Sequence, residues 1–319
     1  MSNLTPDKRS IEEAAIRIAP WIHRTPVLTC AAINEITGGN LFFKCENFQK
    51  AGAFKSRGAT NAVFQLDDET LRRGVATHSS GNHAAALSLA AKRKGTRAYV
   101  VMPENSSKIK ISAVESYGGI VTFCKPTLEA REETLAEVIR KTGACEIHPY
   151  NDLRIIAGQA TAALEMIQDI PEITQLIAPV GGGGLLSGTA LAAEYFGTNI
   201  RVIAAEPLGA ADAWQSFTSG AFVPSVNPQT IADGLRTSLG SVTFPIIRKF
   251  VDDIVTVSED SIVHAMRLIW ERMKIIVEPS SAVPLAAILE DKINVREVST
   301  GIILSGGNVD LDHLPFNPS

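Results

Sequence analysis

Few cysteines occur in this sequence, and no two of them form a CxxC pair. Scattered thiols of this kind are typical of core packing in a reducing compartment. The first ten residues, Met1 to Ser10, are polar and charged, so they do not resemble a signal peptide. Together these absences lead us to expect a cytoplasmic protein. The cysteines are Cys30, Cys45, Cys124 and Cys145.

An excess of positive charge is also missing. The 319 residues include 30 Lys and Arg against 34 Asp and Glu, which gives a formal net charge of −4. No long basic run that could serve as a polybasic arm is present. Nothing in the composition therefore favours nucleic acid as a partner, and we expect a small molecule instead.

One uncharged run has nearly the length of a membrane helix but lacks its composition. Leu176 to Ala193 carries no charge over 18 residues, which is about the length that spans a bilayer. It contains Pro179 and four consecutive glycines, which would break a helix in lipid and leave backbone groups unpaired. We expect a buried strand, a glycine loop and a helix here, and no contact with a membrane.

What the sequence does contain is an alternation of short β-branched runs with alanine-rich helical stretches. At 45% apolar residues the chain can bury one large core or two smaller ones. Strands that alternate with helices of this length predict an α/β fold with mainly parallel sheets. The expected strands are 40–46, 74–78, 97–102, 120–124, 176–180, 200–206, 253–257 and 301–305. The expected helices include 82–94, 128–142, 158–170, 184–196 and 259–273.

The same alternation indicates how the chain is organised. Residues 74–150 contain three strand–helix units of their own, enough for a small domain, and the second half carries a further set. Residues 219–228 read as a surface connection. In such folds a site lies at the carboxyl ends of the strands. Lys55, Ser79 and Gly181 each follow a strand-like run or its turn, as residues of one shared cleft would.

Four consecutive glycines, Gly181 to Gly184, stand between a strand-like run and a helical stretch. Glycines let successive N–H groups converge on an anion, and the helix dipole adds positive charge. A tight strand-to-helix turn is the alternative, but it rarely needs four glycines. No register gives G-x-G-x-x-G, although Glu206 has the spacing of a dinucleotide-binding acid, and no Gly-Lys-Ser/Thr is present. The loop therefore favours a lone phosphate group over a dinucleotide.

Three other segments carry polar chemistry, and each has an ordinary structural explanation. Lys55, between an aromatic residue and a Ser-Arg-Gly turn, could form a Schiff base if burial lowered its pKa, or could reach solvent. The cluster 79–83 suits a carboxylate or a helix N-cap. Ser305 could meet a ring nitrogen or belong to a glycine turn. Together, and in this order, the four segments look like a site for pyridoxal 5'-phosphate (PLP).

The chain resembles the branch of fold-type II PLP enzymes that contains serine racemases and serine, threonine or 3-hydroxyaspartate dehydratases, related to the tryptophan synthase β chain. The resemblance extends from residues 24–28 through 44–49 to 304–311, and the four motifs occur in the family order. It implies two open twisted α/β domains with PLP in the cleft between them. Residues 1–73 and 151–319 would form the large PLP-binding domain and residues 74–150 the small domain. It also implies a homodimer.

The resemblance implies a role for each motif. Lys55 would carry PLP and act as a base, and Phe54 would pack against the cofactor ring. Asn82 would bond the ring hydroxyl, and Ser305 would face the ring nitrogen, leaving it largely unprotonated. The glycines of the loop would hold the phosphate. These are Gly181, Gly182, Gly183 and Gly184.

Further residues match the family's substrate and cation sites. Ser79, Ser80, Asn82 and His83 match the pocket for the substrate carboxylate, and Ser80 also matches the second acid–base residue of the racemases. Arg131 matches an arginine that can approach a second substrate carboxylate, although an exposed helix arginine is the alternative. The cation site, for Mg²⁺ or alternatively Ca²⁺ or Mn²⁺, is matched by Glu206, Ala210 and Asp212, which offer hard oxygen ligands.

The sequence thus predicts a PLP-dependent lyase that converts a 3-hydroxy amino acid to a 2-oxo acid and ammonia. Serine, threonine and 3-hydroxyaspartate are the candidate substrates, with serine racemisation as a parallel activity. One alternative is an enzyme that is mainly a serine racemase, and another is a dehydratase specific for 3-hydroxyaspartate. From other classes, a nicotinamide oxidoreductase and a non-catalytic phosphometabolite-binding protein remain as alternatives.

Overall fold

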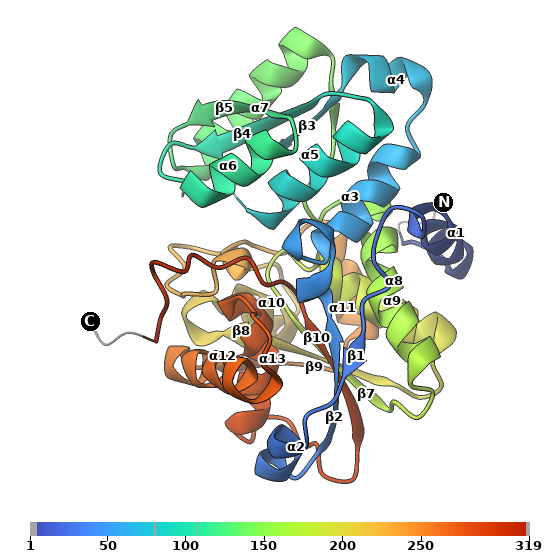
Figure 1. Ribbon diagram of the computed structural model, residues 1–319, viewed down its shortest axis with the longest axis vertical. Coiled ribbons are helices and arrows are strands. Elements are labelled where there is room, and N and C mark those ends of the chain that lie inside the picture. The colour runs from blue at the N-terminus through green and yellow to red at the C-terminus, as the bar shows by residue number, and fades with distance from the viewer. Residues whose placement is uncertain (1–4, 80, 107, 317–319) are drawn as a thin grey trace.

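The computed structural model describes residues 5–79, 81–106 and 108–316, and its strands form two separate sheets (Figure 1). The larger sheet has six strands in the order β1-β2-β10-β7-β8-β9. Only the β1–β2 pair is antiparallel, and the other neighbours are parallel. The strands are β1 (Val27–Leu28), β2 (Asn40–Cys45), β7 (Gln175–Pro179), β8 (Arg201–Pro207), β9 (Asp253–Val257) and β10 (Ser299–Leu304).

The smaller sheet has four parallel strands and is built entirely from residues 75–146. Its order is β5-β4-β3-β6, and three helices connect the strands in chain order. Figure 1 shows it as a separate layered unit above the larger sheet. Its elements are β3 (Val75–His78), α5 (Asn82–Lys94), β4 (Ala98–Pro103), α6 (Lys108–Ser116), β5 (Gly119–Cys124), α7 (Leu128–Thr142) and β6 (Cys145–Glu146).

Helices cover both faces of the larger sheet, and two apolar clusters lie on its two sides. Strands buried on both faces are expected to be apolar throughout, and β7 is buried at every residue. The remaining helices are α1 (Lys8–Ile18), α2 (Ala31–Thr37), α3 (Lys55–Phe64), α4 (Asp68–Arg73), α8 (Leu153–Asp169), α9 (Gly184–Phe196), α10 (Asp212–Ser219), α11 (Thr243–Phe250), α12 (Glu259–Met273) and α13 (Pro279–Leu289).

Glycines let three of these helices pack backbone against backbone. A methyl group on Gly158 of α8 would lie 2.6 Å from Cα of Gly58 in α3. A methyl group on Gly188 of α9 would lie 2.6 Å from the Ala160 nitrogen of α8. Both distances are too short for a side chain, so these glycines fix how α3 and α9 lie against α8. This matters because Lys55 begins α3 and the glycine loop begins α9.

The predicted α/β fold is confirmed, and most of the expected elements lie within one or two residues of their predicted bounds. Helices 82–94, 128–142, 184–196 and 259–273 have the bounds that were expected. The prediction for 158–170 was wrong at its start: α8 begins at Leu153, because the Asp152 side chain accepts from the Arg154 N–H and caps the helix there.

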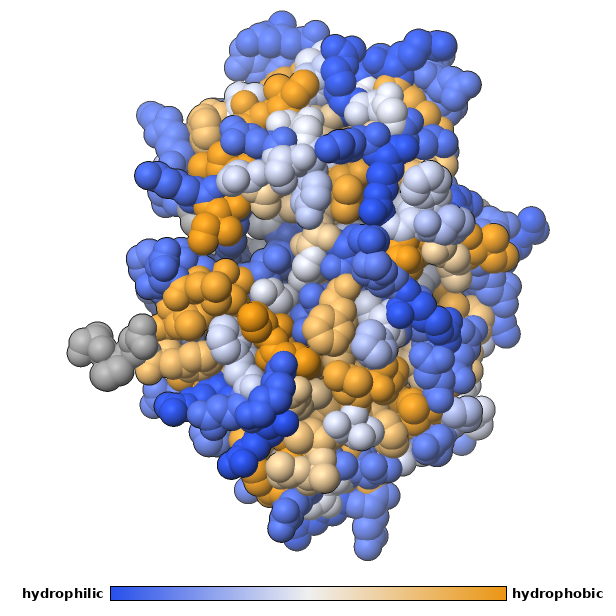
Figure 2. Space-filling view, viewed as in Figure 1, coloured by the Kyte–Doolittle hydropathy of each residue, from blue (hydrophilic) through white to orange (hydrophobic). Residues whose placement is uncertain are grey.

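The long uncharged run forms β7, the glycine loop and the start of α9, as expected. No helix in the described part of the chain is long and apolar enough to cross a membrane. On the face shown in Figure 2, hydrophilic and hydrophobic residues are interspersed over both units. The segment after α10, residues 220–230, is mostly exposed, in keeping with the predicted surface connection.

Candidate active site

The predicted motifs converge because the strands that precede them are neighbours in the sheets. β7 and β10 are parallel and adjacent, so the glycine loop and Ser305 leave the same edge of the larger sheet. The Phe54 N–H donates to the Ser305 carbonyl at 3.0 Å, and Ala53 forms a bridge to Gly306. Lys55 is thereby fixed beside Ser305, although 250 residues separate them in the sequence.

Lys55 is a partly buried amine that has one hydrogen-bond acceptor among the described residues. Its Nζ donates to the Pro149 carbonyl at 2.8 Å and lies 5.1 Å from the centre of the Phe54 ring. Burial lowers the pKa of the amine from 10.5 to about 8, against the opposing attraction of Glu278. A substantial fraction of the amine is therefore neutral near physiological pH, as a nucleophile or base requires.

The glycine loop has the features of a phosphate cradle. Gly183 stands at the N-cap of α9 with φ of 85°, and no side chain caps the first turn in the described structure. Those N–H groups and the helix dipole are available to an anion. Methyl groups at Gly181 and Gly182 would lie 2.8 Å from Leu235 Cα and 2.3 Å from Tyr150 Cδ1. The residues present thus fit the phosphate of PLP and leave no room for side chains in the loop.

Ser305 is buried and has a second serine beside it. Its Oγ lies 3.1 Å from the Oγ of Ser281 in α13. Ser281 donates to the Gly306 carbonyl at 2.6 Å and accepts from the Gly306 N–H at 2.7 Å. Because the Ser281 proton goes to that carbonyl, the Ser305 hydroxyl is the donor in its contact with Ser281 Oγ, and it must turn away from Ser281 to donate to another acceptor. A neutral hydroxyl of this kind suits an unprotonated ring nitrogen.

Asn82 lies at the start of α5, where it meets two residues of the larger-sheet unit. Its Nδ2 is 3.0 Å from each carboxylate oxygen of Glu278, and its Oδ1 accepts from Asn308 Nδ2 at 2.9 Å. Sequence reasoning assigned no role to Glu278 or Asn308. They are 196 and 226 residues from Asn82, and no local pattern of residues marks a contact of that range.

The other residues of the 79–83 cluster lie around the same helix start. The Ser79 N–H donates to the Val101 carbonyl at 3.1 Å. His83 is buried, and its Nε2 lies 3.1 Å from the Ile147 carbonyl, so this nitrogen carries the proton. Burial, followed by the charge of Lys55, holds the pKa of His83 well below its usual value. Ser80, the predicted second acid–base residue, lies outside the described residues.

Arg131 on α7 faces the smaller sheet. Its Nε is buried and has no hydrogen-bond partner within the described residues. Its positive charge contributes to the lowered pKa of His78, after burial. A cavity of about 500 Å³ is lined in part by the end of β3 and by the residue before Pro149. It is lined by His78, Glu132, Leu135, Ala136, Ile139, Arg140, Glu146 and His148.

The predicted cation ligands lie together at the end of β8. Glu206 is fully buried and accepts from the Ala213 and Trp214 N–H groups at 3.0 and 2.9 Å. Both oxygens of Asp212 are buried without a hydrogen-bond partner in the described chain. Burial raises the pKa of Glu206 to about 8 and that of Asp212 to about 6. Two buried carboxyl groups without a positive partner fit a divalent cation.

Glu206 and Asp212 are the two carboxyl side chains of this candidate cation site. In the described residues, no group of three or more His, Cys, Asp or Glu side chains is placed to hold a metal. Any cation would therefore need further oxygen ligands. Ala210, the predicted backbone ligand, lies between the two acids in the chain and ends the short 3-10 helix Leu208–Ala210.

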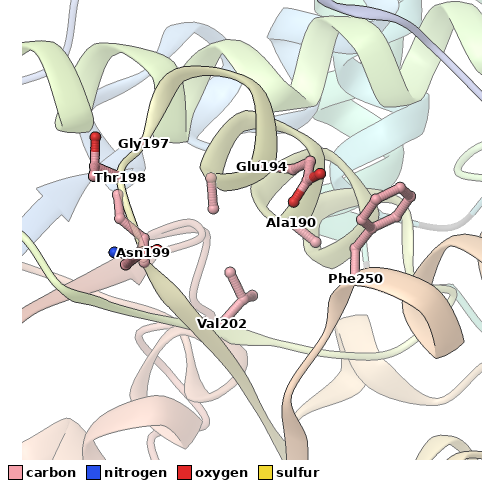
Figure 3. A pocket seen from close by; sticks show the side chains of 9 residues that line it. Ala190, Glu194, Gly197, Thr198, Asn199, Val202 and Phe250 are labelled. Atoms are coloured by element: carbon pink, nitrogen blue, oxygen red, sulfur yellow. The ribbon is translucent and has the colours of Figure 1, made fainter.

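A second cavity, of about 350 Å³, lies away from these residues (Figure 3). It opens at the carboxyl end of α9, opposite the glycine loop, between Glu194, Asn199 and Phe250. None of the predicted site residues lines it, so it takes no part in the candidate site.

Comparison with known proteins finds relatives over nearly the whole chain. The family model described as pyridoxal-phosphate dependent enzyme matches residues 18–306. Serine racemase of Dictyostelium discoideum is 52% identical over 312 residues, covering 96% of each chain. The beta-hydroxyaspartate dehydratase of Paracoccus denitrificans (strain Pd 1222) is 50% identical over 301 residues, 94% of this chain and 96% of that protein. The crystal structure of T.th. threonine deaminase matches with a TM-score of 0.91 and 40% identity, over 98% of this chain and 100% of that one.

Proposed function

Because this chain belongs to the pyridoxal-phosphate dependent enzymes, we propose that it removes the β-hydroxyl of a 3-hydroxy amino acid, with serine racemisation as a parallel activity. The products are a 2-oxo acid and ammonia. Relatives that are named serine racemase, beta-hydroxyaspartate dehydratase and threonine deaminase support this reaction. The observation that carries it is Lys55: an amine with a lowered pKa, bound to one carbonyl, beside a glycine loop built for phosphate.

PLP, when bound, supplies an electron sink that stabilises negative charge at the substrate Cα. Lys55 would hold it covalently, and the N–H groups of the Gly181–Gly184 loop would hold its phosphate. The Asn82 amide would meet the ring hydroxyl, and the Ser305 hydroxyl would donate to the ring nitrogen. A neutral serine there keeps the electron sink weaker than an aspartate would, which favours prompt loss of a leaving group.

The proton transfers are assigned to Lys55. Its neutral amine accepts the Cα proton, and the resulting ammonium donates a proton to the departing β-hydroxyl, which leaves as water. The C–H and C–O bonds break in this sequence, and no oxidant is needed. The released enamine tautomerises and takes up water to give the 2-oxo acid and ammonia. A group with a pKa near 8 can both accept the Cα proton and donate a proton to the leaving hydroxyl.

A substrate with a second carboxylate is favoured by Arg131. Its buried Nε lacks a partner in the described structure, and a carboxylate would supply a charge-assisted one. Asn82 and His83, at the start of α5, would meet the α-carboxylate through backbone N–H groups, and Ser79 would meet it through its hydroxyl. We therefore propose 3-hydroxyaspartate as a substrate alongside serine and threonine.

Serine racemisation, the parallel activity, needs a second acid–base group opposite Lys55. Ser80 is the residue assigned to it, so Ser80→Ala should remove racemisation while elimination continues. Chiral analysis of L-serine incubations together with the 2-oxo acid yield separates the two reactions. Equal loss of both would mean that Ser80 is no racemisation base.

The accessory features are proposals as well. Glu206, Ala210 and Asp212 would bind Mg²⁺, or alternatively Ca²⁺ or Mn²⁺, as a structural or activating ion. Residues 74–150 would form the small domain, and residues 1–73 and 151–319 the large domain. A homodimer is supported by exposed apolar side chains on contacting segments, Phe48 and Ile276. The four free cysteines support a reducing cytoplasm.

The test of the function is one incubation series with PLP and Mg²⁺. It would contain L-serine, D-serine, L-threonine and the 3-hydroxyaspartate isomers, followed for 2-oxo acid, ammonia and chiral composition. We expect stoichiometric 2-oxo acid and ammonia from at least one of them, with Lys55→Ala inactive. Binding of PLP without release of either product from any substrate would contradict the proposal.

A further inference from the structure

Glu278 is a buried carboxylic acid beside Lys55 that takes no part in the reaction described above. It is 4% exposed and stands at the N-cap of α13. An N-cap side chain usually accepts from the first turn of its own helix, but within the described structure that of Glu278 makes no such bond. Its oxygens accept from Asn82 instead. A buried carboxyl group that does not cap its own helix needs another reason to be there.

The first consequence of this placement is a fixed orientation of the Asn82 amide. Its Nδ2 faces the Glu278 carboxylate, and its Oδ1 accepts from Asn308, which also donates to the Ala51 carbonyl at 2.8 Å. The hydrogen bonds therefore fix both the Nδ2 and the Oδ1 of Asn82. A flip of this amide would place its oxygen against the Glu278 carboxylate and its nitrogen against Asn308 Nδ2. Because Asn82 belongs to the smaller-sheet unit and its partners to the larger, the contact also joins the two across the site.

Two glycines leave the space that this arrangement needs. A methyl group at Gly306 would lie 2.8 Å from Glu278 Oε1, and one at Gly52 would lie 2.3 Å from Asn308 Oδ1. Gly306 is one of the glycines that follow Ser305 in the sequence. The glycine turn after β10 therefore has two roles. It turns the chain, and it leaves space for the Glu278 carboxylate.

The second consequence is electrostatic. Glu278 lies close to Lys55, because its N–H donates to the Gly306 carbonyl at 3.0 Å and Gly306 forms a bridge to Ala53, two residues before Lys55. In the described site its carboxylate opposes the effect of burial on the amine. The charges that face Glu278 itself are Lys55, Asp233 and Lys110. Burial and then Asp233 raise the pKa of Glu278 to about 7, while Asn82 and Lys110 lower it. Its carboxyl therefore changes charge in the same pH range in which Lys55 does.

We propose that Glu278 is a positioning residue that orients the Asn82 amide and places a negative charge that stabilises the ammonium form of Lys55. This deepens the proposed function, because it concerns the residues that would hold the cofactor. Removal of the carboxylate charge leaves the Lys55 ammonium buried without a compensating charge in the described site. The neutral amine then prevails at a lower pH.

The direct test uses the apoprotein, so it requires neither PLP nor turnover. Trace labelling with acetic anhydride as a function of pH, read for Lys55 by peptide mass spectrometry, gives the titration of that amine. The wild type should show half-labelling near pH 8. In Glu278→Gln the midpoint should fall by about one pH unit, a tenfold change in the ratio of neutral to charged amine. An unchanged midpoint would overturn the proposal.

A matched control lies at the other end of the same helix. Glu290 follows α13, about 16 Å from its start, and accepts from the Ser258 N–H and hydroxyl. Glu290→Gln removes one carboxylate charge far from Lys55 and should leave the midpoint unchanged. If it lowered the midpoint as much as Glu278→Gln does, a general effect of net charge would replace the proposal.

A second variant covers the possibility that Glu278→Gln does not fold. Asn82→Ala removes the donor that favours the charged carboxylate, so Glu278 becomes neutral at a higher pH and the Lys55 midpoint should fall as well. An unchanged midpoint here also contradicts the proposal. Because the readout is labelling of the apoprotein, a failure of the proposed reaction would leave this result intact, and the two failures are distinguishable.

Discussion

Two interior lysines, Lys44 and Lys55, differ in how their charge is balanced. Lys44 is fully buried, donates to the Thr25 carbonyl at 2.7 Å and forms an ion pair with Glu165 at the same distance. Lys55 has one carbonyl partner and no ion pair within the described residues. A buried charge with a direct partner is held in one state, whereas one without a partner can change its protonation. The first lysine is structural and the second can do chemistry.

The network around Lys44 is complete. Arg57, two residues after Lys55, makes two hydrogen bonds to each of Glu46 and Glu165, at 2.7 to 2.8 Å. Two positive and two negative side chains thus cancel in the interior. They tie the first turn of α3 to β2 and α8, which fixes the position from which Lys55 projects.

The largest expected effect comes from removal of the unpaired lysine. Lys55→Ala should lower turnover by about 10²–10⁴-fold or more, since a proton-transfer group is lost, while the fold persists because no ion pair is broken. The matched variant Lys44→Ala should behave in the opposite way, with a lower stability and residual turnover in the folded fraction. Initial rates give the turnover of each variant, and urea unfolding gives its stability. If both variants lost turnover and stability to the same extent, the distinction between Lys44 and Lys55 would be wrong.

Removal of Arg57 should have the largest effect on stability. Arg57→Met leaves Glu46 and Glu165 buried with too few partners, and loss of one member of a buried pair costs about 3–5 kcal/mol. The free energy of unfolding in urea measures this cost. A loss below about 1 kcal/mol would show that the network relaxes or is hydrated, and that Lys44 and Lys55 differ less than their contacts indicate.

A smaller and selective effect is expected at Arg131. Arg131→Ala should raise KM for 3-hydroxyaspartate by about 10- to 100-fold. This is the loss of affinity expected when one or two hydrogen bonds to a charged group are removed. L-Serine has no second carboxylate, so its KM should change little. Parallel kinetics with both substrates provide the internal control, and an equal rise for both would remove Arg131 from substrate recognition.

The smallest effect concerns Glu206 and Asp212, two carboxyl groups that lack a positive partner in the described structure. The folded pKa of Glu206, about 8, lies above its usual 4.5. Its contribution to stability is therefore present below about pH 4.5 and is lost as the pH rises towards 8. Without divalent cations, thermal stability should fall over this range, and Mg²⁺ or Ca²⁺ should restore it.

Glu206→Gln is the control for this loss of stability. The variant keeps the size of the side chain and removes its charge, so both the pH dependence and the stabilisation by the cation should shrink. Melting temperatures at pH 5 and pH 8, with and without the cation, suffice. A variant that still responds to Mg²⁺ as the wild type does would place the ion elsewhere.

The sequence predicts the regular parts of this fold well because they depend on local periodicity. Helix 184–196 and strand 253–257 are cases where the pattern and the glycine or capping residues at the ends agree. The two-residue strands β1 and β6 are too short to carry a pattern. Among the helices not named from the sequence is α13, which contains Pro284. A proline inside an apolar run is ordinarily a sign against a helix.

The same division holds for the site. The glycine loop and Lys55 have sequence signals because they need particular backbone shapes and a particular amine. Glu278 and Glu165, the distant partner of Arg57, have none, since their roles come from contacts across 100 or more residues in the folded chain. Only the structure distinguishes a paired buried charge from an unpaired one.

The most direct measurement of this distinction is borohydride reduction of the PLP-loaded protein, followed by peptide mapping. Reduction fixes the cofactor to the lysine that holds it. We expect the pyridoxyl group on the peptide that contains Lys55 and none on the peptide that contains Lys44. A label on another lysine, or none despite bound PLP, would contradict the claim that the unpaired lysine carries the chemistry.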